Sequence, residues 1–189
     1  MIEYIPVTMI LEKLEGFPPF PALPEYDIRT FQPGQKEDWA CLQSTTDSFK
    51  NSDEARIHFD HEFGPHYADM SDRCFFLFDQ NNTCIGTAMA WFASDPFAKD
   101  YGRLHWVAIH PDWRGRGLGK YLINHTVRQM SRWHEKVYLT TQTTSFVAIA
   151  IYLDLGFKPL VSSKMDRKAW ELLSGILDNR RLPDSDIVS

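Results

Sequence analysis

The chain reads LHWVAIHPDWRGRGLGK from residue 104 to residue 120. The stretch begins as an apolar run that predicts a strand, passes through a glycine-rich turn, and continues into an amphipathic segment that predicts a helix. The first turn of a helix has unpaired backbone N–H groups and the positive end of the helix dipole. Glycines let the backbone approach a phosphate without a Cβ in the way. The stretch therefore predicts an anion-binding corner that would hold a pyrophosphate.

Two familiar phosphate motifs fail on spacing here. A P-loop needs four residues between its glycines and then Gly-Lys-Ser/Thr, but only three residues separate Gly115 from Gly119, and Tyr121 follows Lys120. A dinucleotide-binding turn needs G-x-G-x-x-G and an acidic residue about 20 positions further on. This chain has G-x-G-x-G, and residue 139 is a leucine. A plain basic turn before a surface helix remains the alternative, because isolated glycine motifs are weak signals.

The pattern Arg-x-x-Gly-x-Gly, formed by Arg114, Gly117 and Gly119, does fit the turn. It resembles the acetyl-CoA signature of the GNAT superfamily of N-acetyltransferases. A second segment, residues 145–157, reads SFVAIAIYLDLGF and is similar to the family's Asn-x-x-Ala-x-x-x-Tyr-x-x-x-Gly-Phe, with Ser145 where asparagine is usual. The resemblance covers about residues 27–161 and is strongest over residues 104–157.

The resemblance implies an α/β fold: a GNAT-type mixed sheet with a central β-bulge strand, flanked by helices. The pattern of apolar residues along the chain agrees with this fold. It predicts strands at residues 27–32, 75–78, 83–92, 103–110, 137–142 and 158–162, and helices at residues 35–49, 52–63, 119–133 and 145–155. Residues 4–12 favour a further strand. Gly156 is expected to end the last of these helices.

The C-terminal part departs from the family, which usually ends in two more strands. Residues 166–177 have the pattern of an amphipathic helix, so we expect a C-terminal helix in place of the usual last strand. That strand is then absent or is supplied by the N-terminal segment. We expect three regions: an N-terminal extension packed on the domain (residues 1–26), an N-acetyltransferase domain (residues 27–178) and a flexible tail (residues 179–189).

Composition limits the class of protein. The chain has 189 residues, 43% of them hydrophobic, which suits one globular domain and excludes wholesale disorder. The net charge of -5 gives no support for nucleic-acid binding and mildly favours a cationic substrate. Three cysteines without C-x-x-C spacing, no signal segment and no long apolar run predict a cytoplasmic protein that does not bind membranes. Homodimer formation is left open.

The resemblance also implies a cofactor, acetyl-CoA as cosubstrate, and the residues that would hold it. In the family, the bulge splays the central strand from its neighbour, and the pantetheine arm enters the gap and pairs with backbone groups. Here Val107 and Ile109 would supply those groups, and one N–H would hold the developing oxyanion. The residues expected to bind the cofactor are Val107, Ala108, Ile109, Arg114, Gly115, Arg116, Gly117, Leu118, Gly119, Lys120, Ser145 and Tyr152.

Acyl transfer to an amine needs a group that accepts a proton, because an alkylammonium of pKa about 10.4 is protonated at neutral pH. His105 is the candidate base, since it lies on the strand that leads to the bulge, and a member of the family has a histidine at the matching place. A structural histidine of a buried strand is the alternative.

Tyr152 matches the tyrosine of the second family motif and is the candidate general acid for the departing CoA thiolate. A phenol of pKa near 10 needs help to protonate a thiol of pKa about 8.5, such as a hydrogen bond formed in the transition state. The alternative is a core aromatic residue on an apolar helix.

Three histidines, His58, His61 and His66, cluster with Glu62 near the second predicted helix. His58 and His61 are three residues apart, but no cysteine joins them and H-E-x-x-H is missing, so a solvated helix face is favoured and no metal site is predicted. In the family this region borders the acceptor pocket. The acidic and aromatic residues that would shape substrate choice are Glu54, Glu62, Phe59, Phe63, Tyr67, Trp91 and Phe92.

These residues predict an acyltransferase that moves acetyl from acetyl-CoA to a primary amine of a small molecule, by direct attack in a ternary complex. A protein lysine or N-terminus is the alternative acceptor. A non-catalytic acyl-CoA-binding regulatory module is the alternative from another functional class.

Overall fold

The computed structural model describes residues 2–46 and 48–177, which form two compact units. One unit takes in residues 2–17, 92–103 and 130–177, and the other takes in residues 18–46, 48–91 and 104–129. Each unit has its own strands, helices and buried side chains.

Seven strands and six α-helices are described. The strands are β1 (Pro6–Leu11), β2 (Asp27–Thr30), β3 (Cys74–Phe78), β4 (Cys84–Trp91), β5 (Tyr101–Ile109), β6 (Lys136–Gln142) and β7 (Lys158–Leu160). The helices are α1 (Lys36–Gln43), α2 (Ser52–Phe63), α3 (Met70–Arg73), α4 (Leu118–Met130), α5 (Phe146–Asp154) and α6 (Lys164–Ser174). The strand order is β2-β3-β4-β5-β6-β1-β7, and the boundary between the units falls within β5. Parallel and antiparallel pairs both occur, which confirms the predicted mixed α/β class.

In the unit of residues 18–91 and 104–129, β2, β3 and β4 form an antiparallel meander. All five residues of β3 are buried, as expected for a strand covered on both faces. A tight turn joins β3 and β4: the Asp79 carboxylate accepts the N–H groups of Asn81 and Thr83, and Asn82 has a φ of 59°.

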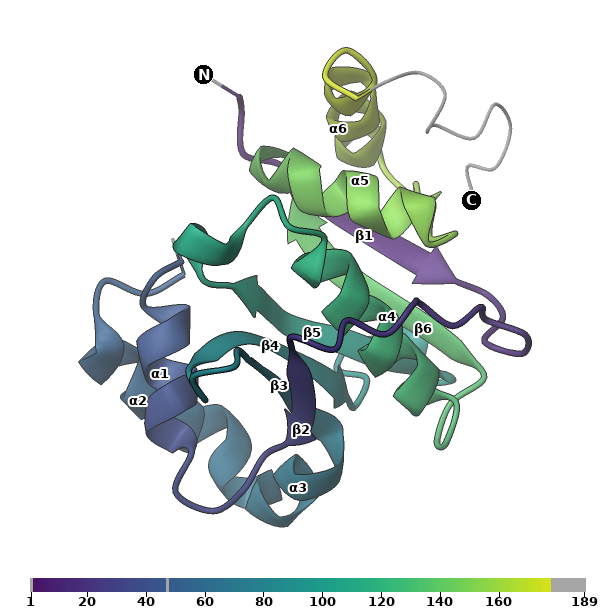
Figure 1. Ribbon diagram of the computed structural model, residues 1–189. Helices are drawn as coiled ribbons and strands as arrows, with labels where there is room; N and C mark the ends of the chain where they lie inside the picture. The colour runs from purple at the N-terminus through teal and green to yellow at the C-terminus, as the bar shows by residue number, and fades with distance from the viewer. Residues whose placement is uncertain (1, 47, 178–189) are drawn as a thin grey trace. The chain divides into compact units, whose positions relative to one another are not determined.

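Helices α1 and α2 pack against each other in the same unit (Figure 1). Their shared core centres on Trp39, which is fully buried and lies 5.3 Å from the Phe59 ring and 5.6 Å from the Phe63 ring. Phe59 and Phe63 are four residues apart on α2, so both face α1. The three rings therefore belong to the buried core that α1 and α2 share.

The predicted ends of two helices were wrong. Helix α4 ends at Met130 instead of Trp133. Helix α1 ends at Gln43 instead of Phe49, because the hydroxyls of Ser44, Thr45 and Thr46 donate to the carbonyls of the last turn in place of further helix. Helix α2 spans the predicted residues 52–63, and its N-cap is Asn51, whose side chain accepts the N–H of Glu54.

In the unit that contains β1, this N-terminal strand lies between β6 and β7 and is antiparallel to both. Met9 faces Leu139 on one side and Pro159 on the other. The N-terminal segment therefore contributes an internal strand. Helix α6 packs against β1, and Figure 1 shows α5 crossing in front of that strand. Helix α6 confirms the expected C-terminal helix.

The proline-rich segment after β1 is fixed to α4 by one buried side chain. The Asn124 amide donates to the Pro18 carbonyl and accepts the Phe20 N–H, at 3.0 and 3.1 Å. The domain limits at residues 26 and 178 stay predictions, and the predicted tail at residues 179–189 lies outside the described residues.

Candidate active site

The extended backbone conformation of β5 (Tyr101–Ile109) is interrupted at one residue, Trp106, which has a φ of 46°. A bulky residue in this left-handed region costs on the order of 1–3 kcal/mol and persists only where its surroundings hold it. The Trp106 carbonyl accepts a hydrogen bond from the Gln43 side chain of α1 at 3.2 Å. A residue in the left-handed region within a strand is a feature of some β-bulges, and Trp106 lies on the strand where the family resemblance implies one.

One carboxylate, that of Glu62 on α2, holds three side chains around this interruption. Glu62 Oε1 lies 2.6 Å from His105 Nε2. Its other oxygen, Oε2, accepts the Trp106 indole N–H at 2.9 Å and lies 2.7 Å from His58 Nε2. Because His58 and Glu62 are one helical turn apart, both reach β5 from the same side of α2.

Glu62 stays ionised in this setting. Burial raises its pKa, but the hydrogen bond and charge of His105, followed by the hydrogen bonds of Trp106 and His58, outweigh burial and lower the pKa from an ordinary 4.5 to about 2. An ionised carboxylate only accepts hydrogen bonds, so His105 Nε2 must carry a proton. The neutral form of His105 is then the Nε2–H tautomer, which has its acceptor lone pair on Nδ1.

The lowered pKa of Glu62 predicts a pH dependence of stability. A carboxyl group whose pKa is lower in the folded than in the unfolded state stabilises the fold above about pH 4.5, and this stabilisation is lost as the pH falls toward 2. We therefore expect the free energy of unfolding of the wild type to fall more steeply between pH 5 and pH 3 than that of Glu62→Gln. Denaturant titrations of both proteins at several pH values would measure this free energy. The same decrease with falling pH in the wild type and in Glu62→Gln would contradict the prediction.

Aromatic rings hold Trp106 in its strained conformation. The Phe49 ring stacks on it at 5.3 Å, and the Trp39 and His58 rings meet it edge-on at 5.3 and 5.0 Å. These contacts join α1 and α2 to the middle of β5. The backbone next to His105 is thus held by the same two helices, α1 and α2.

The glycine-rich turn lies between the 3-10 turn η3 (Pro111–Trp113) and α4. Gly115 and Gly117 have φ values of 76° and 78°, which side chains other than glycine rarely adopt. A Cβ built on either residue would meet no atom within 4 Å, so open space faces the turn. Helix α4 begins at Leu118, and its first N–H groups have no partner within the helix. The turn fits a diphosphate.

The arginines of the turn fold back on the segment before it. Arg114 Nε donates to the Ile109 carbonyl at 3.1 Å. An Arg116 nitrogen donates to the Asp112 carbonyl at 3.2 Å, and the guanidinium lies 4.7 Å from the centre of the Trp113 ring. Since carbonyls and rings carry no net charge, both positive charges remain available to attract an anion to the turn.

The three predicted cofactor residues of β5 lie between His105 and the turn. Ala108 is buried, while Val107 and Ile109 are half-buried. After them the His110 N–H donates to the Ile85 carbonyl at 2.8 Å. The pairing of Val107 and Ile109 with a pantetheine arm stays a prediction.

Ser145 and Tyr152 lie in the other unit, on α5 and the turn before it. Gln142 donates to the Ser145 hydroxyl at 2.8 Å. Tyr152 is buried near the end of α5, where Phe157 N–H donates to the Tyr152 carbonyl and Gly156 N–H to that of Leu153. With Gly156 at a φ of 89°, this is a Schellman ending, and it confirms the expected role of Gly156.

Burial raises the pKa of Tyr152 above its ordinary value of 10, so its phenol stays protonated at neutral pH. It can donate a hydrogen bond to a developing thiolate, but a full proton transfer to it is unfavourable. The rings of Tyr152 and Phe157 lie 5.8 Å apart, so the motif also packs the end of the helix.

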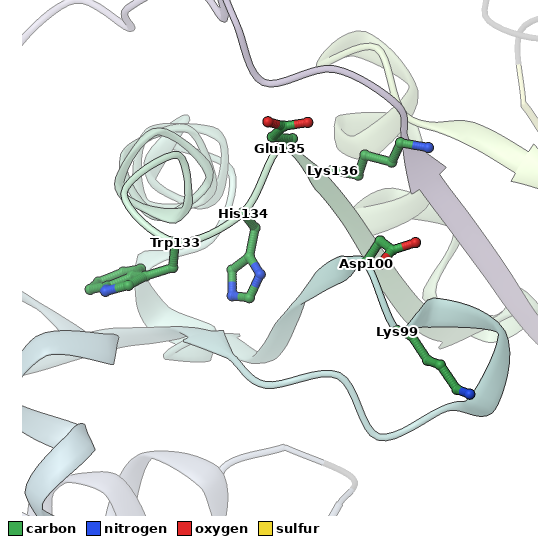
Figure 2. Close-up of a pocket in the computed structure, with 6 residues that line it drawn as sticks. All are labelled: Lys99, Asp100, Trp133, His134, Glu135 and Lys136. Atoms are coloured by element: carbon green, nitrogen blue, oxygen red, sulfur yellow. The ribbon is translucent and has the colours of Figure 1, made fainter.

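The structure has a hollow of about 470 Å³ at the beginnings of β5 and β6. Its lining residues are Lys99, Asp100, Trp133, His134, Glu135 and Lys136 (Figure 2). None of them belongs to the predicted site. In the part of the chain that the structure describes, no three His, Cys, Asp or Glu residues are arranged to hold a metal ion, and no helix is both long and apolar enough to span a membrane.

Sequence reasoning missed how Glu62, Trp106 and Gln43 act together. Glu62 was expected to border the acceptor pocket, and the four-residue spacing of His58 and Glu62 was the only local signal of the contact between those two. Glu62 and His105 are 43 positions apart, so no local sequence pattern reveals the contact between them.

Comparisons with known proteins show which family the chain belongs to. The model of the acetyltransferase (GNAT) family matches residues 37–157. The chain is 34% identical over 70 residues to the [ribosomal protein bS18]-alanine N-acetyltransferase of Salmonella typhimurium, which is 36% of this chain and 47% of that protein. The enzyme of the same name from Escherichia coli K12 is 33% identical over 70 residues. The chain thus spans about half the length of the curated relatives it matches.

Solved structures share the fold. A GCN5-related N-acetyltransferase from Sphaerobacter thermophilus has a TM-score of 0.65 at 17% identity, over 82% of this chain and 48% of that one. A GNAT acetyltransferase from Colwellia psychrerythraea has a TM-score of 0.63 at 10% identity, over 83% of this chain and 54% of that one. The bulged strand, the glycine turn before α4, the Schellman ending of α5 and the family match lead to one conclusion: the chain belongs to the GNAT family of acetyltransferases.

Proposed function

We propose that the chain is an N-acetyltransferase that transfers acetyl from acetyl-CoA to a primary amine of a small molecule, by direct attack in a ternary complex. The observation that carries the proposal is the turn with Gly115 and Gly117 at positive φ, open to solvent, at the start of α4. This is the arrangement that a diphosphate needs: bare backbone N–H groups at the positive end of a helix dipole.

Bound there, acetyl-CoA would supply an activated acetyl thioester. The turn at Gly115–Lys120 would hold its diphosphate on backbone N–H groups, and the charges of Arg114 and Arg116 would attract it. Val107 and Ile109 would present backbone groups to the arm, and one of their N–H groups would hold the developing oxyanion.

The acceptor ammonium must lose two protons, one to become the amine that attacks and one as the new C–N bond replaces the C–S bond. His105 would take one of them at Nδ1, since Nε2 donates to Glu62, and the departing thiolate would end with the other as the free thiol. The Glu62 carboxylate would stabilise the imidazolium that forms. Tyr152 would donate a hydrogen bond to the departing thiolate.

The test is release of free CoA thiol with a panel of primary amines, followed by mass spectrometry of the acetylated product. Tight acetyl-CoA binding without thiol release for any acceptor would indicate the non-catalytic module instead. A second acceptor class is favoured by one observation: the curated relatives that match 70 residues are named for an alanine of a ribosomal protein. Peptides with N-terminal alanine therefore belong in the panel, and faster turnover of these peptides would favour a protein substrate.

Tyr152→Phe is expected to lower kcat by about 10- to 100-fold, the loss of one hydrogen bond to a charged group. The ring stays, so packing against Phe157 is kept. Tyr138→Phe is the matched control, because Tyr138 is also buried and its hydroxyl accepts the Ser94 N–H. Equal kcat in the wild type and both variants would leave Tyr152 as a core aromatic residue.

A further inference from the structure

Glu62 is the one carboxylate that contacts both residues at the interruption of β5, among those the structure describes. We propose that Glu62 is the positioning residue of His105: it holds the imidazole as the Nε2–H tautomer and directs Nδ1 to the acceptor amine. The inference rests on the proposed function, because the nitrogen it positions is the one assigned there as the base.

The geometry of the carboxylate supports this role. Glu62 keeps 24% of its side chain exposed and His105 keeps 13%, so their 2.6 Å contact is largely shielded from water. Shielding strengthens a charge-assisted hydrogen bond and makes its direction matter. The donors His58 and Trp106 occupy the other oxygen. The carboxylate therefore cannot turn without losing a partner.

Glu62 also fixes the backbone next to His105. The Trp106 indole can only donate, and its donation to Glu62 holds the residue from α2 while Gln43 holds its carbonyl from α1. Trp106 is the residue with positive φ. One carboxylate thus sets both the orientation of the His105 ring and the backbone turn that follows it.

The variant Glu62→Gln tests the role because an amide cannot accept on both ends. Its N–H group would face at least one of the three donors. The Trp106 indole cannot accept a hydrogen bond, but a neutral histidine can change its tautomer and accept one from the amide N–H. We expect His105 to do so, with Nε2 as acceptor and the proton on Nδ1. The variant would then lack the basic nitrogen on the acceptor side while keeping nearly the same shape.

The groups that contact Glu62 and titrate are His105 from β5 and His58 from α2, and Trp106 stays neutral. For Glu62→Gln we expect kcat to fall about 10²-fold with little change in the KM of acetyl-CoA. We also expect the acidic limb of the pH–rate profile to move to lower pH, because the imidazolium loses its counter-charge. Glu62→Asp keeps the negative charge, so it should lose less kcat and shift the acidic limb less than Glu62→Gln does.

The tautomer itself is measured by nitrogen-15 NMR of the histidine rings in the full chain without any ligand. We expect Nε2–H for His105 in the wild type and Nδ1–H in Glu62→Gln. Asp60→Asn on the same helix, which removes an exposed partner of Lys36, is the matched control and should keep Nε2–H. Trp106→Phe removes another donor to Glu62, and His105 should keep the Nε2–H tautomer in this variant too.

An Nδ1–H tautomer in the wild type, or Nε2–H in Glu62→Gln, would overturn the inference. This readout needs no turnover, so it separates the two proposals. A wild type that acetylates no amine would end the proposed function, whereas an active wild type with an unchanged tautomer, kcat and pH profile in Glu62→Gln would end the positioning role alone.

Discussion

Replacing His105 with alanine is expected to lower kcat for acetyl transfer by about 10²- to 10⁴-fold, the usual contribution of a general base. The physical reason is that the acceptor is an ammonium ion at neutral pH, and the variant has no group at this place to take its proton. The affinity for acetyl-CoA should stay within a few-fold, because the glycine turn is untouched. Steady-state kinetics with the best amine of the panel, and calorimetry with acetyl-CoA, measure the two effects separately.

The pH of the assay provides an internal check on the His105 prediction. At high pH more of the acceptor is already deprotonated, so the deficit of His105→Ala should shrink as the pH rises from 7 to 10. His61→Ala is the control, since His61 is an exposed histidine of the same helix as Glu62. A deficit that is the same at every pH would mean that His105 shapes the strand and accepts no proton.

The sequence predicted well those features that depend on local chemistry. Gly115 and Gly117 were expected to free the backbone for an anion, and both have positive φ. Gly156 was expected at the end of α5, and it forms the Schellman ending there. The roles of these glycines could be predicted because glycine adopts positive φ values in turns and at helix ends, where other residues are disfavoured.

Other features depend on contacts between residues that are distant in sequence, and these features could not be predicted. The strand propensity of residues 6–11 is local, but the choice of β6 and β7 as partners depends on tertiary packing. Trp106 lies in a run that patterning treats as ordinary strand, and its positive φ is held by Gln43 and by rings from α1 and α2. The contact of Glu62 with His105 likewise appears only in the folded chain.

Gly117→Glu is expected to weaken acetyl-CoA binding by about 10³-fold. Two unit charges about 4 Å apart near a protein surface repel by about 4 kcal/mol, and the new carboxylate would lie beside the diphosphate. Strain adds to this effect, because Gly117 has a φ of 78° that a side chain disfavours. Calorimetric titration with acetyl-CoA gives the Kd, and Gly117→Ala, which has the strain without the charge, should weaken binding far less.

Gly34 is the matched control for a glutamate placed at positive φ. It has a φ of 98° and, like Gly117, no atom within 4 Å of a built Cβ, but it lies in the loop before α1. Gly34→Glu should therefore lower the melting temperature about as much as Gly117→Glu and leave the Kd of acetyl-CoA unchanged. If both variants bound acetyl-CoA as the wild type does, the turn before α4 would not be the diphosphate site. The assignment of the cofactor, and with it the transfer reaction, would then lose its structural basis, because the proton-handling residues act only on an acceptor placed beside a bound thioester.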